Sequence, residues 1–316
     1  MVHGKVKKEK NIVNTNNILI PEKSEMKNLP AIDWKRVETL IDLALSEDLG
    51  DLGDTTTTAC VPENARAQAI LLCKEDEMVL AGIGVAEKVF KTIDPALEFT
   101  ALKSDGDLCV RGEKLAVISG SARSILTGER TALNFIQRLC GVATMSRIYA
   151  RELEGTSCIV LDTRKTTPGY RNLEKYAVAV GGAGNHRIGL YDRIMIKDNH
   201  RELAAIEGDG AITRAVDRAR AAYPQLEIEV EADTLDEVAE AANCGVEHIM
   251  LDNMSNEEMK KAVAINAGRA KLEASGGITL KRLASIGQIG VDFVSSGALT
   301  HSVRSMDISL DIEVCR

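Results

Sequence analysis

The second half of the sequence, from about residue 155 onward, alternates short apolar runs with stretches that are compatible with helices. Each apolar run ends in polar or glycine residues, and the runs are CIVLDTRK (158–165), RIMIKDNH (193–200), EIEVEAD (227–233), EHIMLDN (247–253), KLEASGG (271–277) and VDFVSSG (291–297). Helix-compatible stretches separate them, most clearly at 212–222, 234–243, 256–267 and 279–286. Strands that alternate with helices predict parallel βαβ units and a parallel sheet covered by helices.

The number of these runs limits the architecture further. Six predicted strands are two fewer than the eight of a closed α/β barrel, so we expect an open, incomplete barrel. A doubly wound sheet is the alternative architecture. In both, the C-terminal ends of the strands share one face, and that face carries the ligand site.

The first half of the sequence has a different, mixed pattern. A helix is predicted to begin after Asp33, which suits an N-cap, and to end at Gly50. A strand is predicted at 65–73, and further helices at 84–93 and 122–139. These elements predict an α+β domain that precedes the parallel sheet.

Composition narrows the class of protein. A formal net charge of −8 argues against a general nucleic-acid binder, and no apolar run approaches the ~20 residues of a membrane span. The seven cysteines are scattered without a CxxC pair, which favours reduced thiols in a cytoplasmic protein over disulfides or a zinc site. Residues 1–30, which contain no signal-peptide pattern, are interpreted as a mobile extension.

Charged residues and glycines gather at the ends of the predicted strands. They are the potential cations Arg164, Lys165, His186, Arg187 and Lys197, the acids Glu231 and Asp252, and the turns Ser275-Gly276-Gly277 and Ser295-Ser296-Gly297. Arginine and lysine bind carboxylates and phosphates, and glycine-rich turns before helices bind phosphate through backbone N–H groups. Separated carboxylates beside such anions attract Mg²⁺. The pattern therefore predicts a phosphorylated, metal-chelating substrate beside a second anion.

Several long motifs, in this order, resemble those of the quinolinate phosphoribosyltransferase family, the decarboxylating nicotinate-nucleotide pyrophosphorylases. They are TGERTALNFIQRLCGVAT (127–144), DTRKTTPGYR (162–171), GGAGNHRIGLYDRIMIKDNH (181–200), LDN (251–253), EASGGI (273–278) and SSGALTH (295–301). The resemblance runs from about residue 33 to the C-terminus. It implies an α+β sandwich domain at 31–140 and an open six-stranded α/β barrel at 141–299. Residues from about 300 to 316 would return to the sandwich domain.

The resemblance also implies a reaction. The phosphoribosyl group of 5-phosphoribosyl-1-pyrophosphate is transferred to the ring nitrogen of quinolinate, and nicotinate mononucleotide, pyrophosphate and CO₂ are formed on the route to NAD. By resemblance, quinolinate is bound by Arg130, Arg164, His186, Arg187 and Lys197. Lys165, Glu231 and Asp252 act on the pyrophosphate side, the two acids through Mg²⁺. The phosphate is held by Ser275, Gly276, Gly277, Ser296 and Gly297, with His301 close by.

Two of these assignments have specific alternatives. Glu227, Glu229 and Glu231 alternate onto one face of a strand, so Glu229 is the alternative to Glu231. An ion pair with Lys165 or Arg164 is the structural explanation for either acid. Asp162 is expected to support the loop that carries Arg164.

Arg130 belongs to the predicted helix at 122–139, outside the barrel. In the family that the sequence resembles, the matching arginine reaches the quinolinate pocket of the neighbouring subunit, which implies a homodimer. The structural alternative is an ion pair between Arg130 and Glu129 on the helix surface.

Two other functions compete with this interpretation. A phosphoribosyltransferase that acts on nicotinate without decarboxylation would need fewer cations than the sequence provides. A non-catalytic relative that binds a phosphorylated ligand, or serves molybdate metabolism, would retain the fold but lose site residues. None of the motif positions is lost here.

Overall fold

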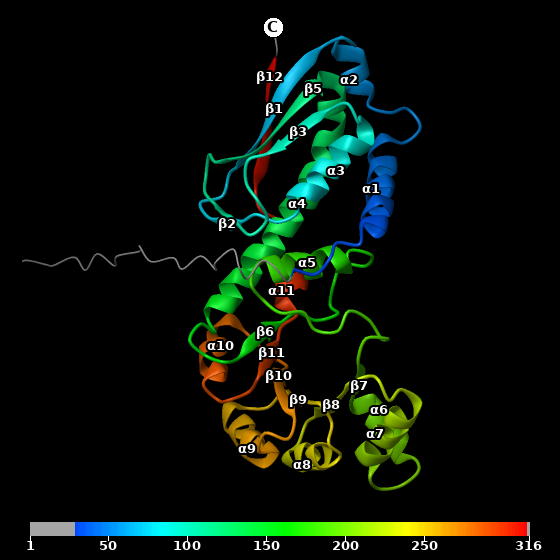
Figure 1. The fold of residues 1–316 in the computed structure, drawn as a ribbon, viewed down its shortest axis with the longest axis vertical. Helices are drawn as coiled ribbons and strands as arrows, with labels where there is room; N and C mark the ends of the chain where they lie inside the picture. The colour runs from blue at the N-terminus through cyan, green and yellow to red at the C-terminus, as the bar shows by residue number, and fades with distance from the viewer. Residues whose placement is uncertain (1–28, 315–316) are drawn as a thin grey trace, which may run out of the picture.

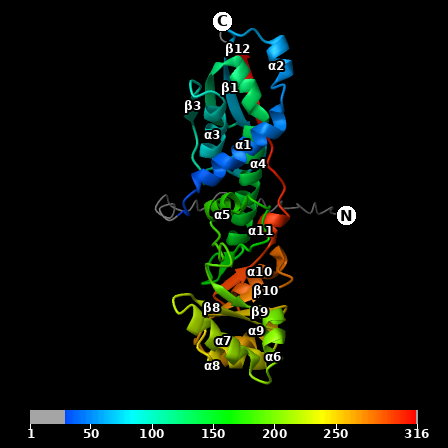
Figure 2. The same ribbon diagram turned by 90° about the vertical axis from the view of Figure 1, so that its right-hand side faces the viewer.

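A computed structural model describes residues 29–314 of the chain. It is elongated, with one sheet at each end and the long helix α4 (Ala122–Arg151) running between them (Figures 1 and 2). The N-terminal extension expected at residues 1–30 lies almost entirely outside the described residues, so its predicted mobility stays a prediction. Within residues 29–314, no helix combines the length and hydropathy that a membrane span requires.

The first sheet is antiparallel and contains four strands in the order β12-β1-β5-β3. These strands are β1 (Arg66–Cys73), β3 (Glu98–Ala101), β5 (Lys114–Ser121) and β12 (Ile308–Val314). The short strands β2 (Met78–Val79) and β4 (Leu108–Cys109) form a separate pair. Strand β12 comes from the end of the chain and lies beside β1, near its beginning (Figure 1).

Three helices accompany α4 in this part of the chain: α1 (Trp34–Leu49), α2 (Thr55–Cys60) and α3 (Ile83–Ile93). The predicted caps of α1 are confirmed, because the Asp33 side chain accepts a hydrogen bond from the Arg36 amide and Gly50 follows the last turn. Helix α4 extends well beyond the predicted end at residue 139. Most of its continuation is buried, because it packs against α5 and β6 of the second part.

The second sheet is parallel, with the order β6-β11-β10-β9-β8-β7. All six predicted strands are confirmed, at β6 (Ile159–Leu161), β7 (Ile194–Ile196), β8 (Ile228–Ala232), β9 (His248–Asp252), β10 (Lys271–Ser275) and β11 (Phe293–Ser295). The pairing found in the described residues ends at β6 and β7, so the sheet is open and not closed into a barrel. This is the incomplete architecture that the strand count predicts.

Helices follow the strands in the expected alternation. They are α5 (Arg171–Val180), α6 (Asp198–Ala205), α7 (Ala211–Ala222), α8 (Leu235–Asn243), α9 (Asn256–Asn266), α10 (Leu280–Gly287) and α11 (Ala298–His301). Capping boxes begin α8 at Thr234 and α9 at Ser255, immediately after the loops that follow β8 and β9. The last residues of each strand therefore lie at the same edge of the sheet, immediately before the loop that leads to the next helix.

Candidate active site

A cavity of about 790 Å³ lies at the carboxyl ends of the parallel strands. Of the residues predicted from sequence, it is lined by Arg164, Lys165, His186, Arg187, Lys197, Glu231, Asp252, Ser275, Gly276 and Gly277. Thr163, Met195, Asp198, Asn199, Met250, Asn253 and Ser295 complete the lining. The predicted cations, acids and first glycine turn therefore meet in one place.

The remaining predicted residues lie outside this lining. Ser296 is buried, and its amide donates to the Leu161 carbonyl. Gly297 lies against His301 and Lys165, since a Cβ added to it would be 2.7 Å from His301 Cδ2 and 2.9 Å from Lys165 Cδ. This turn is therefore adjacent to the cavity, and a larger residue at 297 would displace the side chain of His301 or Lys165.

Arg130 is the predicted residue that is most clearly separated from the cavity. It lies on α4 with an exposed side chain and is not part of the cavity lining of its own chain. Its charge acts on the neighbouring Glu129, whose pKa is raised by burial and lowered to a smaller extent by Arg130.

The cationic wall of the cavity has donors available for an anion. The Nε atom of Arg164 is buried and has no hydrogen-bond partner among the described residues. Burial lowers the pKa of Arg187, and the positive charge of Arg164 lowers it further. Guanidinium groups that repel each other and leave an N–H group unpaired are stabilised when a bound anion lies between them.

The loop that carries His186 and Arg187 is held by a buried ion pair. Lys175 Nζ lies 2.5 Å from Asp162 Oδ1 and also donates to the His186 carbonyl at 2.7 Å. Asp162 accepts hydrogen bonds from the His186 amide and from the side chain of Asn185. Asp162 is expected from the sequence to support the loop that carries Arg164, but its side chain contacts the 181–187 loop and Lys175 instead, because that loop returns across the end of β6.

The two acids of the cavity have unequal surroundings. Glu231 Oε2 accepts a hydrogen bond from Lys197 Nζ at 2.7 Å, so its ion-pair partner is Lys197, not the Lys165 or Arg164 considered from sequence. Burial raises the pKa of Asp252, and the negative charges of Glu231 and Asp233 raise it further. Two carboxylates that both face the cavity, with Glu231 destabilising the charged form of Asp252, form a donor set that suits Mg²⁺.

The glycine turn after β10 depends on backbone conformation. Gly276 has a φ of +81°, and an added Cβ would lie 2.1 Å from the Asn253 side-chain oxygen. The Asn253 amide donates to the Ser275 carbonyl, which ties the β9 and β10 loops together. Glycine at 276 therefore brings the loop that contains Asp252 next to the proposed phosphate turn.

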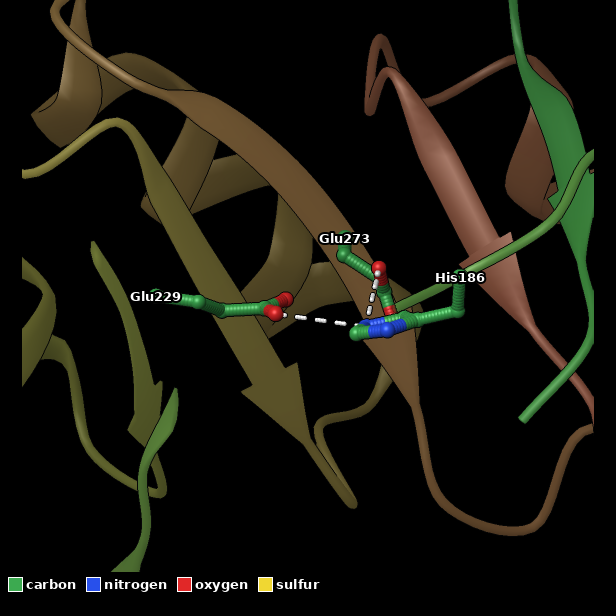
Figure 3. Close-up of side chains that lie close together, drawn as sticks. All are labelled: His186, Glu229 and Glu273. Atoms are coloured by element: carbon green, nitrogen blue, oxygen red, sulfur yellow. Dashed lines mark ion pairs between the residues drawn. The ribbon is translucent and has the colours of Figure 1, made fainter. Parts of the chain in front are cut away.

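Below the cavity lies a cluster of His186, Glu229 and Glu273 (Figure 3). The two carboxylates come from different strands, β8 and β10, and both point at the His186 ring. Glu273 was not identified from sequence. The signal was available, because Glu229 and Glu273 each precede a cavity residue, Glu231 and Ser275, by two positions and so share its face of the strand.

Comparison with known proteins assigns both parts of the chain to one family. The family models described as quinolinate phosphoribosyl transferase, N-terminal domain and C-terminal domain, match residues 54–140 and 142–311. A relative from Oryza sativa subsp. japonica, named nicotinate-nucleotide pyrophosphorylase [carboxylating], chloroplastic, is 44% identical over 90% of this chain and 79% of its own length. A Bacillus subtilis protein, named as the probable enzyme of the same kind, is 42% identical over 88% and 93%.

A solved structure agrees with these matches. The crystal structure of NadC from Streptococcus pyogenes superimposes with a TM-score of 0.85 at 40% identity, and the match covers 91% of this chain and 100% of that one.

Proposed function

The chain belongs to the quinolinate phosphoribosyltransferase family, and on that premise we propose how its cavity carries out the family's reaction. The chain is a nicotinate-nucleotide pyrophosphorylase of NAD biosynthesis. It transfers the phosphoribosyl group of 5-phosphoribosyl-1-pyrophosphate to the ring nitrogen of quinolinate. The products are nicotinate mononucleotide, pyrophosphate and CO₂.

The observation that carries the proposed site is the cationic wall of the cavity, in which Arg164 keeps a buried N–H group without a partner among the described residues. Quinolinate has two carboxylates, and binding it requires more than one cation to offset the cost of desolvation. Arg164 has a buried N–H group without a partner among the described residues, and Arg187 is destabilised by the charge of Arg164. These two arginines are proposed to bind the quinolinate carboxylates, with Lys197 and His186 completing the pocket.

The other side of the cavity is proposed to bind the phosphoribosyl donor. The turn at Ser275, Gly276 and Gly277 is proposed to offer backbone N–H groups to the 5-phosphate. In the adjacent turn, Gly297 would contribute its N–H group and Ser296 its hydroxyl, since the Ser296 amide donates to the Leu161 carbonyl. Lys165 extends into the cavity next to Gly297 and would offset the negative charge of the departing pyrophosphate.

Glu231 and Asp252 are proposed to hold Mg²⁺. The fit rests on two carboxylates that face one cavity, where the charge of Glu231 raises the free energy of the charged form of Asp252. When bound, the ion supplies positive charge to the pyrophosphate oxygens. Lys197, which pairs with Glu231 in the described residues, would then be free to contact quinolinate.

Decarboxylation follows from the first step. Once the ring nitrogen carries the ribose, the ring is cationic and stabilises the carbanion that CO₂ leaves at ring carbon 2. That carbon then takes up one proton, which gives nicotinate mononucleotide. The part of the protein is to orient the ring and to hold the remaining carboxylate.

The functional unit is proposed to be a homodimer in which Arg130 reaches the partner's quinolinate pocket. Arg130 is exposed and lies one helical turn before Asn134 on α4. Asn134 lines an open hollow of about 370 Å³ with Ala44, Phe135, Arg138, Thr167 and Tyr170. A second copy of the chain that covers this side of α4 would shield the hollow. Arg130 would then add a further cation to the quinolinate pocket of that copy.

A cytoplasmic location is also a proposal. It rests on cysteines that are all free thiols among the described residues. The rice relative is named chloroplastic and a Nicotiana glauca relative mitochondrial, so fractionation of cells of the source organism tests this point.

The experiment that tests the function is a direct assay. The purified protein is incubated with Mg²⁺, 5-phosphoribosyl-1-pyrophosphate and quinolinate labelled in the 2-carboxylate, and labelled CO₂ and nicotinate mononucleotide are measured. We expect both products in equal amounts, and little turnover of nicotinate, because one carboxylate would leave pocket cations unpaired. Nicotinate turnover at a similar kcat/KM, or ligand binding without turnover, would support one of the two competing functions instead.

A further inference from the structure

The His186 ring lies between the cavity and two fully buried carboxylates. Its Nε2 atom is 3.2 Å from Glu229 Oε2 and 3.5 Å from Glu273 Oε2 (Figure 3). Both glutamates are 0% exposed, and His186 is 7% exposed. Both Glu273 oxygens and Glu229 Oε1 have no hydrogen-bond partner of good geometry among the described residues. A buried carboxylate without a hydrogen-bond partner destabilises the folded protein unless its charge is compensated.

A backbone hydrogen bond fixes which nitrogen of the His186 ring carries the hydrogen. The Arg187 amide donates to His186 Nδ1 at 2.7 Å, so Nδ1 carries a lone pair and the hydrogen of the neutral ring is on Nε2. That hydrogen lies on the side of the two glutamates, within ion-pair distance of both, although neither carboxylate accepts it with good hydrogen-bond geometry. A metal ion would need the Nε2 lone pair, so the geometry favours a proton over a metal as the compensating cation.

The charges of the groups in this cluster indicate how many protons it holds. Arg193 Nη1 lies 3.4 Å from Glu229 Oε2 and compensates one carboxylate. Burial and, after it, the charge of Glu229 raise the pKa of Glu273 to about 7. Burial lowers the pKa of His186, but the nearby carboxylates of Glu229 and Glu273 raise it overall. The raised pKa values of Glu273 and His186 both indicate one proton in addition to the hydrogen of the neutral ring. Because the Arg187 amide donates to Nδ1, the ring cannot take up this proton, and it lies on Glu273.

The groups that face Glu273 come from every element packed around it. They are Glu229 on β8, His186 on the 181–187 loop, Arg193 before β7, Ser295 on β11 and the buried thiol of Cys158 before β6. His248 on β9 acts on Glu229.

We propose that Glu273 is a positioning residue of the quinolinate pocket, which acts as a buried carboxylic acid and holds the neutral His186 ring in place. This rests on the proposed function of the pocket. In this state the cluster, including Arg193, carries no net charge below the substrate. Loss of the Glu273 proton would place a second negative charge under a dianionic substrate and would weaken quinolinate binding at alkaline pH.

The first test is independent of activity. Histidine labelled with ¹⁵N is introduced into the full chain, and the His186 signals are assigned by their absence in a His186→Gln protein. We expect, at pH 7, a neutral ring with the hydrogen on Nε2. A doubly protonated ring, or a ring with its hydrogen on Nδ1, would overturn the proposal. So would one equivalent of bound metal that is lost in Glu273→Gln but retained in Asp252→Asn.

The second test is kinetic. Glutamine is uncharged and resembles the protonated acid, so Glu273→Gln should retain the wild-type quinolinate KM at pH 7, whereas Glu273→Ala should raise it on the order of tenfold. Between pH 7 and pH 9, the quinolinate KM should rise in the wild type, by up to about tenfold per pH unit for one required proton, and stay flat in Glu273→Gln. The KM for 5-phosphoribosyl-1-pyrophosphate should not follow this pattern.

Glu98→Gln, at an exposed position on β3, is the matched control and should retain the wild-type pH profile. An unchanged alkaline rise in Glu273→Gln, or a Gln variant as impaired as the Ala variant, would overturn the positioning role. If the wild type fails to turn over quinolinate, the proposed function fails, while the ring tautomer still tests the proton assignment.

Discussion

At the scale of single residues, the buried ion pair of Lys175 and Asp162 connects stability to the quinolinate pocket. Lys175 is 3% exposed and Asp162 is 0% exposed. Lys175→Met leaves the Asp162 carboxyl buried without its charge partner, which should lower the free energy of unfolding by roughly 3–5 kcal/mol. Urea denaturation followed by circular dichroism measures this change. The quinolinate KM should rise as well, because Lys175 also holds the His186 carbonyl.

The control for this prediction is an exposed pair on α9. Lys260 and Glu257 are 57% and 77% exposed, so Lys260→Met should change stability by no more than about 0.5 kcal/mol. The double variant Lys175→Met/Asp162→Asn removes both charges and should regain part of the loss. Equal losses in Lys175→Met and Lys260→Met would contradict the interpretation.

The proposed magnesium ligands give a second residue-scale prediction. Asp252→Asn should raise the Mg²⁺ concentration for half-maximal activity by about tenfold or more, since even residues that only orient metal ligands contribute ~10–100-fold. Titration of activity with Mg²⁺ is the measurement. Asp233→Asn is the control, because Asp233 contributes negative charge near Asp252 but does not line the cavity.

The same titration separates the two glutamates of β8. Glu231→Gln should shift the Mg²⁺ requirement, whereas Glu229→Gln should leave it unchanged, since Glu229 is buried against His186 below the cavity. The reverse result would assign the metal to Glu229, the alternative that the strand alternation leaves open.

At the scale of elements, the turn after β10 depends on glycine at 276. Gly276→Ala introduces a Cβ at positive φ and against the Asn253 side chain, so the β9 and β10 loops must move apart. We expect the KM for 5-phosphoribosyl-1-pyrophosphate to rise about tenfold or more, because small misplacements at a binding site have large effects. The quinolinate KM should change less.

Gly268→Ala is the matched control for Gly276→Ala. Gly268 also has a positive φ, +75°, but an added Cβ would meet nothing within 4 Å. Both variants should lose roughly 1–2 kcal/mol of stability from the left-handed backbone, and only Gly276→Ala should lose substrate binding. A similar kinetic defect in both would refute a local role for Gly276.

At the scale of the whole molecule, the long helix α4 carries Arg130 and runs from the first sheet toward the second (Figure 2). Arg130 is not part of the cavity lining of its own chain. A shared active site predicts complementation between two inactive variants. Arg130→Ala lacks the residue given to the partner, and Arg164→Ala lacks a residue of its own pocket. After subunit exchange, heterodimers should contain one intact site, and activity should return to about a quarter of the wild-type level in an equal mixture, as statistical pairing dictates.

Native mass spectrometry of the two variants with different tags confirms the exchange. Arg130→Ala mixed with Arg164→Ala/Arg130→Ala is the control, because no combination of these chains restores a site. If heterodimers form and no activity returns, Arg130 acts within its own chain or only pairs with Glu129.

Much of the fold follows from local rules that the sequence carries by itself. The apolar runs predict all six parallel strands, because a buried strand needs continuous apolar side chains. The cap at Asp33 and the stop at Gly50 predict α1, because both depend on bonds within one or two turns. The residues at the strand ends predict the cavity, because parallel strands must end on one edge.

The tertiary structure decided which of these residues meet. Strand β12 pairs with β1, more than two hundred residues away in sequence, and α4 continues past residue 139 because α5 and β6 cover it. Lys197 pairs with Glu231, and His186 is set against Glu229 and Glu273. The sequence specifies the face of a strand through its two-residue period, but the contacts across that face depend on strand order and on loop paths. Those are set by the packing of the whole chain.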